Sequence, residues 1–142
     1  MNAAQLRAQL AGKKPRPARR TRHQAGQMNN LEAEYLRTML EPRQLTGEVT
    51  EIKFESVKLR LADNTFYTPD FSVASDCLEI HEVKGHWEDD ARVKWKVTAE
   101  LYPEYRFFAA TKRKKSDGGG FNVEEYGKLE HSRAKQGNLG ES

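Results

Sequence analysis

Two short runs of the chain carry side chains that could perform hydrolytic chemistry. They are residues 67–71, Tyr-Thr-Pro-Asp-Phe, and residues 82–85, Glu-Val-Lys-Gly. Successive side chains of a strand face opposite sides, so Glu82 and Lys84 are expected to point the same way. If Asp70 lies on the adjacent antiparallel strand of a symmetric hairpin, it is directly opposite Glu82. Opposed residues hold their Cβ atoms about 4.5 to 5.5 Å apart, close enough for two carboxylates to bind one divalent cation.

This set of side chains suits the hydrolysis of a phosphodiester bond. Mg²⁺ prefers an octahedron of oxygen ligands and keeps several waters, so Asp70, Glu82 and the Val83 carbonyl could bind it together with a substrate phosphate. The metal would polarise the phosphate and lower the pKa of a bound water. Lys84 could orient or deprotonate that water and offset charge in the transition state. We therefore expect Mg²⁺, or Mn²⁺, as the cofactor.

Each of these residues also has an ordinary structural interpretation. Asp70 could simply cap a turn, and Glu82 and Lys84 could be a charged pair on the solvent face of a half-buried strand. However, Leu78 and Ile80 precede them on the same face, so the charges continue an apolar row. Burying unpaired carboxylates costs free energy, and a metal ion is the simplest compensation. The joint pattern therefore favours a metal site.

The spacing of apolar residues predicts a helix on either side of these strands. The first covers residues 28–41 and ends at Glu41-Pro42, with Glu32 at the border of its apolar stripe. Glu32 could belong to the site, or it could be a first-turn acid that the helix dipole favours. The second helix runs from about residue 88 to Leu101. Lys94 on its apolar face could contact a scissile phosphate, or its stem could cover apolar surface while its amine reaches water.

The remaining periodic segments are predicted strands. Apolar alternation over residues 52–61 breaks at Glu55-Ser56, where we expect a bulge or a bend. A turn at residues 62–65 then leads into a strand over residues 66–73, which forms a hairpin with the next strand. A final strand covers residues 105–110. The elements therefore follow the order α-β-β-β-α-β, with a three-stranded meander.

Pro69-Asp70 and Glu82-Val83-Lys84 resemble the motif of the PD-(D/E)XK nuclease superfamily. More narrowly, residues 28–35, 66–71 and 79–85 are similar to a phage-associated family related to the phage endonuclease I group of Holliday-junction resolvases. This resemblance covers roughly residues 28–126. It implies an α/β fold with the α-β-β-β-α-β nuclease core, a mixed sheet flanked by helices. It also implies a helical glutamate that completes the metal site, at the position of Glu32, and a functional residue on the second helix, at the position of Lys94.

The charge of the chain is distributed unevenly. The net charge is +3, yet residues 1–31 hold seven basic residues and no acid, which leaves 17 basic and 21 acidic residues in the remainder. Residues 1–27 are therefore predicted to be a disordered basic arm that binds phosphates by counterion release, or alternatively a solubilising tail. Its predicted DNA-binding residues are Lys13, Lys14, Arg16, Arg19, Arg20 and Arg22. A second basic cluster, Lys112-Arg113-Lys114-Lys115, could form one wall of a DNA channel.

The rest of the chain sets the domain organisation. A nuclease domain is predicted over residues 28–126, in which residues 121–126 could dock back as a short element, followed by a polar tail over residues 127–142. Cys77 is the single cysteine, which excludes an intramolecular disulfide, and no apolar stretch is long enough for a signal sequence or a membrane span. We therefore expect a soluble cytoplasmic protein, in a bacterial host cell if a phage encodes it.

Two functions of different classes follow from these observations. The first is a metal-dependent endodeoxyribonuclease, encoded by a phage, that cuts branched or junction DNA. The second is a non-catalytic DNA-binding module on a nuclease-like scaffold that acts in packaging or recombination. The complete set of Asp70, Glu82 and Lys84 favours the enzyme, because clustered acids repel phosphate and would hinder a protein that only binds. RNA as the substrate stays open, and a homodimer is suggested only by analogy with resolvases.

Overall fold

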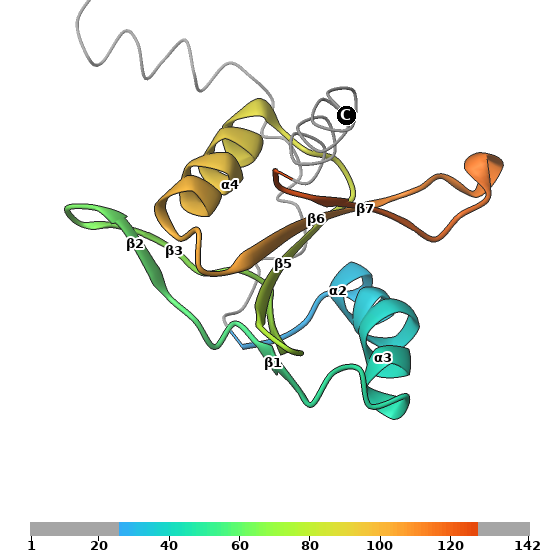
Figure 1. Cartoon of the computed structure of the whole chain (residues 1–142). Coiled ribbons are helices and arrows are strands. Elements are labelled where there is room, and N and C mark those ends of the chain that lie inside the picture. Colours follow the sequence, from blue (N-terminus) through green and yellow to red (C-terminus); the bar gives the residue numbers. More distant parts are fainter. Residues whose placement is uncertain (1–25, 128–142) are drawn as a thin grey trace, which may run out of the picture.

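Within residues 26–127, which the computed structural model describes, a five-stranded mixed sheet forms the centre of the molecule (Figure 1). The strands lie in the order β1 (Glu51–Phe54), β4 (Phe71–Ala74), β5 (Leu78–Lys84), β6 (Arg106–Lys112) and β7 (Phe121–Glu125). β5 and β6 are parallel because helix α4 (Asp89–Leu101) connects them, and the other neighbouring pairs are antiparallel. The α/β class and the mixed sheet flanked by helices are thereby confirmed.

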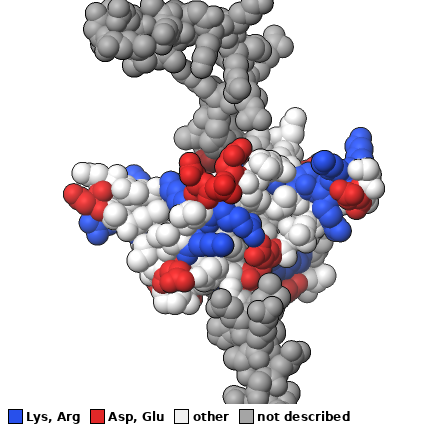
Figure 2. All heavy atoms as spheres, turned by 90° about the horizontal axis from the view of Figure 1, so that it is seen from above, with Lys and Arg blue, Asp and Glu red and all other residues white. Residues whose placement is uncertain are grey.

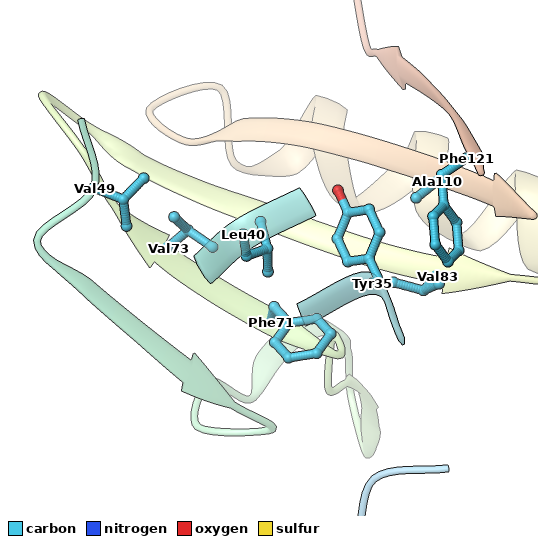
Figure 3. Close-up of a cluster of buried hydrophobic side chains, with 8 residues drawn as sticks. All are labelled: Tyr35, Leu40, Val49, Phe71, Val73, Val83, Ala110 and Phe121. Atoms are coloured by element: carbon cyan, nitrogen blue, oxygen red, sulfur yellow. The ribbon is translucent and has the colours of Figure 1, made fainter. Parts of the chain in front are cut away.

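Alternation along β5 divides the core into two clusters, one on each face of the sheet. Ile80 packs with Trp95 of α4, whereas Val83 packs with Tyr35 of the first helical segment, as Figure 3 shows for the second cluster. Since side chains alternate along a strand, Glu82 continues the row of Ile80 on the α4 face. The predicted placement of charges at the end of an apolar row is confirmed.

The first helical segment is longer than predicted. α2 (Asn30–Tyr35) continues through the π-helical turn η1 (Leu36–Leu40) into α3 (Glu41–Leu45), so the prediction that the helix ends at Glu41-Pro42 was wrong. Proline lacks an N–H and its ring clashes with the carbonyl four residues earlier in a regular helix. Here the wider π turn, in which the Glu41 N–H donates to the Leu36 carbonyl, precedes Pro42 and places it at the start of α3.

The strand predicted over residues 66–73 is two strands in different sheets. β3 (Thr65–Tyr67) pairs with β2 (Leu59–Ala62) as a hairpin, whereas β4 pairs with β1 and β5. Pro69 lies between β3 and β4, where it has no ladder hydrogen bond to donate. The predicted meander is therefore β1–β4–β5, with the β2–β3 hairpin inserted between β1 and β4. The expected break after β1 is confirmed, and Glu55 adopts a φ of 47° there.

β7 adds a strand to the predicted order of elements. The sequence indicated only that residues 121–126 could dock back onto the domain. In the structure, the chain leaves β6, passes through the 3-10 turn η2 (Lys115–Asp117) and returns as β7, which pairs antiparallel with β6. The described order is therefore α-β-β-β-α-β with an inserted hairpin and an added final strand.

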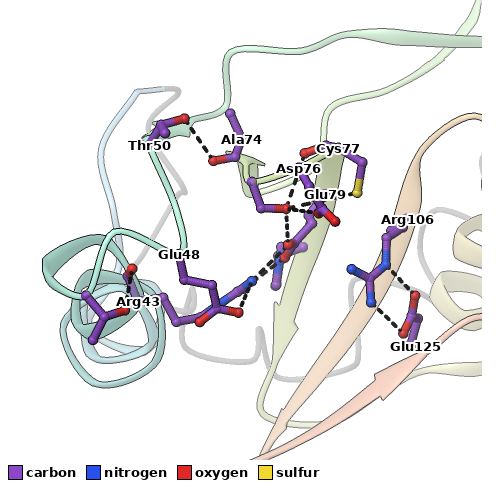
Figure 4. A network of polar contacts seen from close by, with 12 residues as sticks. Arg43, Glu48, Thr50, Ala74, Asp76, Cys77, Glu79, Arg106 and Glu125 are labelled. Carbon is purple, nitrogen blue, oxygen red and sulfur yellow. Dashed lines mark hydrogen bonds and ion pairs between the residues drawn. The ribbon is translucent and has the colours of Figure 1, made fainter.

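A buried polar network fixes α3 to the sheet. Arg43 donates two hydrogen bonds to Glu79, at 2.9 and 2.8 Å (Figure 4), and Ser75 Oγ donates a third at 2.7 Å. Burial lowers the pKa of His81, so the ring is neutral; its Nε2 donates to Glu79 and its Nδ1 accepts from the Tyr35 hydroxyl at 2.7 Å. Burial opposes the charge of Glu79, but the bonds from His81, Arg43 and Ser75 outweigh it and hold the Glu79 pKa well below its usual range.

Arg43→Leu should lower the free energy of unfolding by about 3 kcal/mol, because it removes a positive charge and two hydrogen bonds from the buried Glu79 carboxylate. Chemical denaturation would measure the loss. Arg37→Leu, at an exposed position of η1, is the matched control and should change stability by less than about 0.5 kcal/mol. A loss in Arg43→Leu no larger than that of the control would contradict the stabilising role of the network.

Candidate functional site

Asp70 and Glu82 lie opposite each other where β4 begins and β5 ends. Phe71 of β4 pairs with His81 of β5, so the preceding residue, Asp70, falls opposite Glu82. The Asp70 N–H donates to Glu82 Oε2 at 3.3 Å, and the Val83 N–H donates to Asp70 Oδ2 at 2.8 Å. Both residues are buried, with 7% and 6% of their surface exposed. The predicted pairing is confirmed, and each carboxylate is held by the backbone of the other strand.

The two buried carboxyl groups make ionisation of the site costly. Burial and the neighbouring charge of Glu82 raise the pKa of Asp70 to about 8, although the Val83 N–H and Lys84 oppose this. Burial also raises the pKa of Glu82, against hydrogen bonds and charge from Tyr67 and Lys84. The pair therefore retains a proton at neutral pH unless a positive charge is added beside it.

The two carboxylates open into a pocket of about 990 Å³. Its walls come from the start of α2, the end of β1, the segment before β4, the end of β5 and the start of α4. Lys84 also lines the pocket, and its Nζ lies 3.4 Å from Glu82 Oε1. The structure thus brings together the three residues that the sequence placed at the centre of the site, Asp70, Glu82 and Lys84.

Glu32 lines the same pocket, but its carboxylate also caps α2. Glu32 Oε2 accepts a hydrogen bond from the Asn29 N–H at 2.9 Å, and Asn29 Oδ1 accepts one from the Glu32 N–H at 2.8 Å. This reciprocal pair is a capping box. The charge of Glu32 nevertheless contributes to the raised pKa of Asp70. The first-turn role of Glu32 is confirmed, and its role as a metal ligand stays a prediction.

Tyr67 is a site residue that the sequence did not reveal. Its hydroxyl donates to Glu82 Oε2 at 2.5 Å, and burial together with the charge of Glu82 raises its pKa strongly, so it remains a protonated donor. The alternating pattern over residues 66–73 had placed Tyr67 in the main sheet. Only the departure of β3 into the hairpin turns this ring toward Glu82.

Lys94 does not line the pocket. It is exposed on α4, and its Nζ lies 5.6 Å from the centroid of the Tyr67 ring, within reach of a cation–π interaction. Lys94 therefore approaches the site through Tyr67, and the structure does not show the predicted direct approach to a phosphate in this pocket.

The donor groups of the pocket fit a divalent cation with an incomplete protein shell. In the part of the chain that the structure describes, no three His, Cys, Asp or Glu side chains are arranged to hold a metal ion by themselves. Mg²⁺ is usually bound by one or two carboxylates together with waters and substrate phosphates. Asp70 and Glu82 supply two carboxylates with raised pKa values, and Val83 lines the pocket beside them. A cation there would take the place of the proton that the pair otherwise retains.

The second basic cluster is divided between an ion pair and an exposed loop. Lys112 forms an ion pair with Glu34 of α2, and its Nζ lies 5.0 Å from the centroid of the Phe121 ring. Arg113, Lys114 and Lys115 are exposed where β6 leads into β7. Figure 2 shows Lys and Arg gathered around this end of the molecule, at the right, with acidic side chains nearer the middle of the face. A DNA-channel wall stays a prediction for the cluster.

The basic arm falls outside the described part of the chain. Its predicted DNA-binding residues, from Lys13 to Arg22, precede residue 26, and the polar tail from residue 128 onward is likewise not described.

No family model matches this chain, and neither a curated protein nor a solved structure is significantly similar to it. Among residues 26–127, no helix has the length and apolar character needed to cross a membrane. The function is therefore inferred from the geometry of the site.

Relative to the wild type, Asp70→Asn should raise the free energy of unfolding of the metal-free protein, and the difference should grow as the pH rises from 5 to 8. The folded wild type keeps the Asp70 proton up to about pH 8, whereas the unfolded chain releases it near pH 4. The contribution of Asp70 to the free energy of unfolding therefore falls across this window. The amide of the Asp70→Asn variant does not ionise, so the variant does not lose this contribution as the pH rises. Thermal unfolding in chelator at both pH values would measure it, with the exposed Asp76→Asn as the control. A difference that does not grow with pH would contradict the raised pKa.

Tyr67→Phe should weaken Mg²⁺ binding by about tenfold, because groups that orient metal ligands are typically worth 10- to 100-fold in affinity. The measurement is the Mg²⁺ concentration that gives half of the maximal rise in melting temperature. Tyr126→Phe is the control, since it removes a hydroxyl that donates to Glu100 of α4 instead. Equal Mg²⁺ dependence in wild type and Tyr67→Phe would show that Tyr67 does not position Glu82.

Proposed function

We propose that this chain is a metal-dependent endonuclease that hydrolyses phosphodiester bonds in DNA. The observation that carries the proposal is the pairing of two buried carboxyl groups, Asp70 and Glu82, in an open pocket with Lys84 beside them. Two adjacent buried acids destabilise the fold, since the site is hard to ionise without a cation. A function that requires a divalent cation explains why the chain places both acids there.

Each side chain of the pocket has a distinct task in this proposal. Asp70 and Glu82, with Val83 beside them, would hold the metal, oriented by the Val83 N–H and the Tyr67 hydroxyl. A divalent cation bound there supplies charge neutralisation and Lewis-acid activation of the scissile phosphate. The Lys84 amine, beside Glu82, offsets negative charge that develops on the phosphate and can orient the attacking water.

The order of elements supports the finer proposal of a PD-(D/E)XK fold. A helix, the antiparallel β1–β4–β5 meander, α4 and the parallel strand β6 follow one another as α-β-β-β-α-β. Asp70 lies just before β4, and Glu82, Val83 and Lys84 lie at the end of β5, where the pocket opens. The hairpin β2–β3 and the strand β7 are additions to this core.

DNA as the substrate is supported by charge and by the sequence resemblance. Arg113, Lys114 and Lys115 are exposed at the end of the β6–β7 hairpin, and the arm before residue 26 is basic. Four parts of the proposal rest on the resemblance alone. They are branched or junction DNA as the substrate, a phage origin, action in the bacterial cytoplasm, and a homodimer that spaces two active sites.

Glu82→Gln should reduce cleavage by about three orders of magnitude, because several kcal/mol of transition-state stabilisation depend on the cation. DNA binding in chelator should stay within a few fold of the wild type or become tighter. Wild type and variant would be compared on four-way junction, flap, duplex and single-stranded DNA, with Mg²⁺, Mn²⁺ or chelator. Glu51→Gln, an exposed position on β1, is the matched control.

Metal-dependent cutting that survives in Glu82→Gln would point to a contaminating nuclease or to another site. Tight, salt-sensitive binding by a wild type that cuts none of these substrates would favour the non-catalytic DNA-binding module.

A further inference from the structure

The β2–β3 hairpin forms its own two-stranded sheet among the described residues and projects from one side of the molecule, at the left of Figure 1. Its inner face is well anchored. Leu59 and Tyr67 are buried in the same cluster as Trp95 of α4, and the Tyr102 hydroxyl donates to the Arg60 carbonyl at 2.7 Å. The hairpin is therefore held in place without any partner on its outer face.

The outer face of the hairpin combines two cations with an exposed aromatic ring. Arg60 pairs with Phe66 across the two strands, on the face opposite the buried pair of Leu59 and Tyr67. Phe66 is 42% exposed, and Lys58 Nζ lies 4.4 Å from the centroid of its ring. The Arg60 side chain is 64% exposed. The buried pair on the inner face already anchors the hairpin, so the exposed ring of Phe66 is not required to hold it in place.

This outer face leads directly to the candidate site. Thr68 follows β3 and lines the pocket that holds Asp70 and Glu82. Lys58 precedes β2 at the same end of the hairpin. Asp63 lies in the turn at the far end, 4.0 Å from Arg60, so the end away from the pocket is less favourable for a phosphate. The end of the hairpin that carries Lys58 is therefore the end next to Thr68, which lines the pocket.

We propose that the outer face of the β2–β3 hairpin binds a single-stranded segment of DNA next to the scissile phosphate. A base stacks on Phe66, and the flanking phosphates lie against Lys58 and Arg60. Aromatic side chains interleaved with cations are the usual platform for single strands, whereas the bases of a duplex already stack on one another. This inference rests on the proposed nuclease function and narrows its substrates to DNA with an unpaired strand beside the cut.

Binding of labelled oligo(dT) and of a matched duplex, measured by fluorescence anisotropy in chelator, tests the inference without cleavage. Phe66→Ala should weaken oligo(dT) binding by about tenfold, whereas Phe66→Trp should retain it, since an indole stacks at least as well. Duplex binding should change by less than about twofold in both. Leu45→Ala, at an exposed apolar residue of α3, is the control for general loss of apolar surface.

The cations have a separate signature. Replacing Lys58 and Arg60 together by alanine should reduce the slope of log K against log salt concentration for oligo(dT) by about 0.7 for each charge removed. Melting curves of all variants confirm that each is folded under the assay conditions.

The outcomes separate the hairpin from the nuclease. Unchanged oligo(dT) binding in Phe66→Ala, an equal loss for duplex, or no binding of oligo(dT) by the wild type would overturn the hairpin assignment, even if the wild type cuts DNA. A Phe66-dependent preference for single strands in a protein that cuts no DNA would instead remove the nuclease function and leave the binding face.

Discussion

The antiparallel register between β4 and β5 is the constraint on which the rest of the site depends. Because Phe71 pairs with His81, Asp70 falls opposite Glu82 and both reach the same pocket. A slip of one residue would turn every side chain of one strand to the opposite face of the sheet. It would place Glu82 among the apolar side chains around Tyr35 and move Val83 out of that cluster. The packing of the two core clusters and the geometry of the site are therefore set by the same register.

The structure surrounds the costly acid pair with groups that orient it. The Val83 N–H holds the Asp70 carboxylate, and the Tyr67 hydroxyl and the Lys84 amine contact Glu82. On the other face of the sheet, Arg43 neutralises Glu79 within a closed network, and the pKa of Glu79 is lowered. In the pocket, by contrast, burial outweighs the neighbouring Lys84 amine and raises the pKa values of both carboxyl groups, as expected where an added cation completes the site.

The sequence predicted the parts of the site that depend on local spacing. The opposition of Asp70 and Glu82 follows from the symmetry of a hairpin around Asp76, and Lys84 follows from period-two alternation, so neither requires knowledge of distant contacts. Tyr67 could not be found in this way, since its position depends on the hairpin leaving the main sheet. The sequence also left open whether Lys94 reaches a phosphate or only covers apolar surface, and in the structure Tyr67 lies between Lys94 and Glu82. The helix that continues past Pro42 was missed because the π turn before it has no simple sequence signature.

A crystal structure of the protein grown with Mn²⁺ would locate a bound ion by its anomalous scattering. If the paired acids are a cation site, an anomalous peak lies in contact with carboxylate oxygens of both Asp70 and Glu82, in the pocket that Lys84 lines. A structure at saturating Mn²⁺ with no ion between these two carboxylates, and with Asp70 still bonded to the Val83 N–H, would show that the pair does not bind a cation.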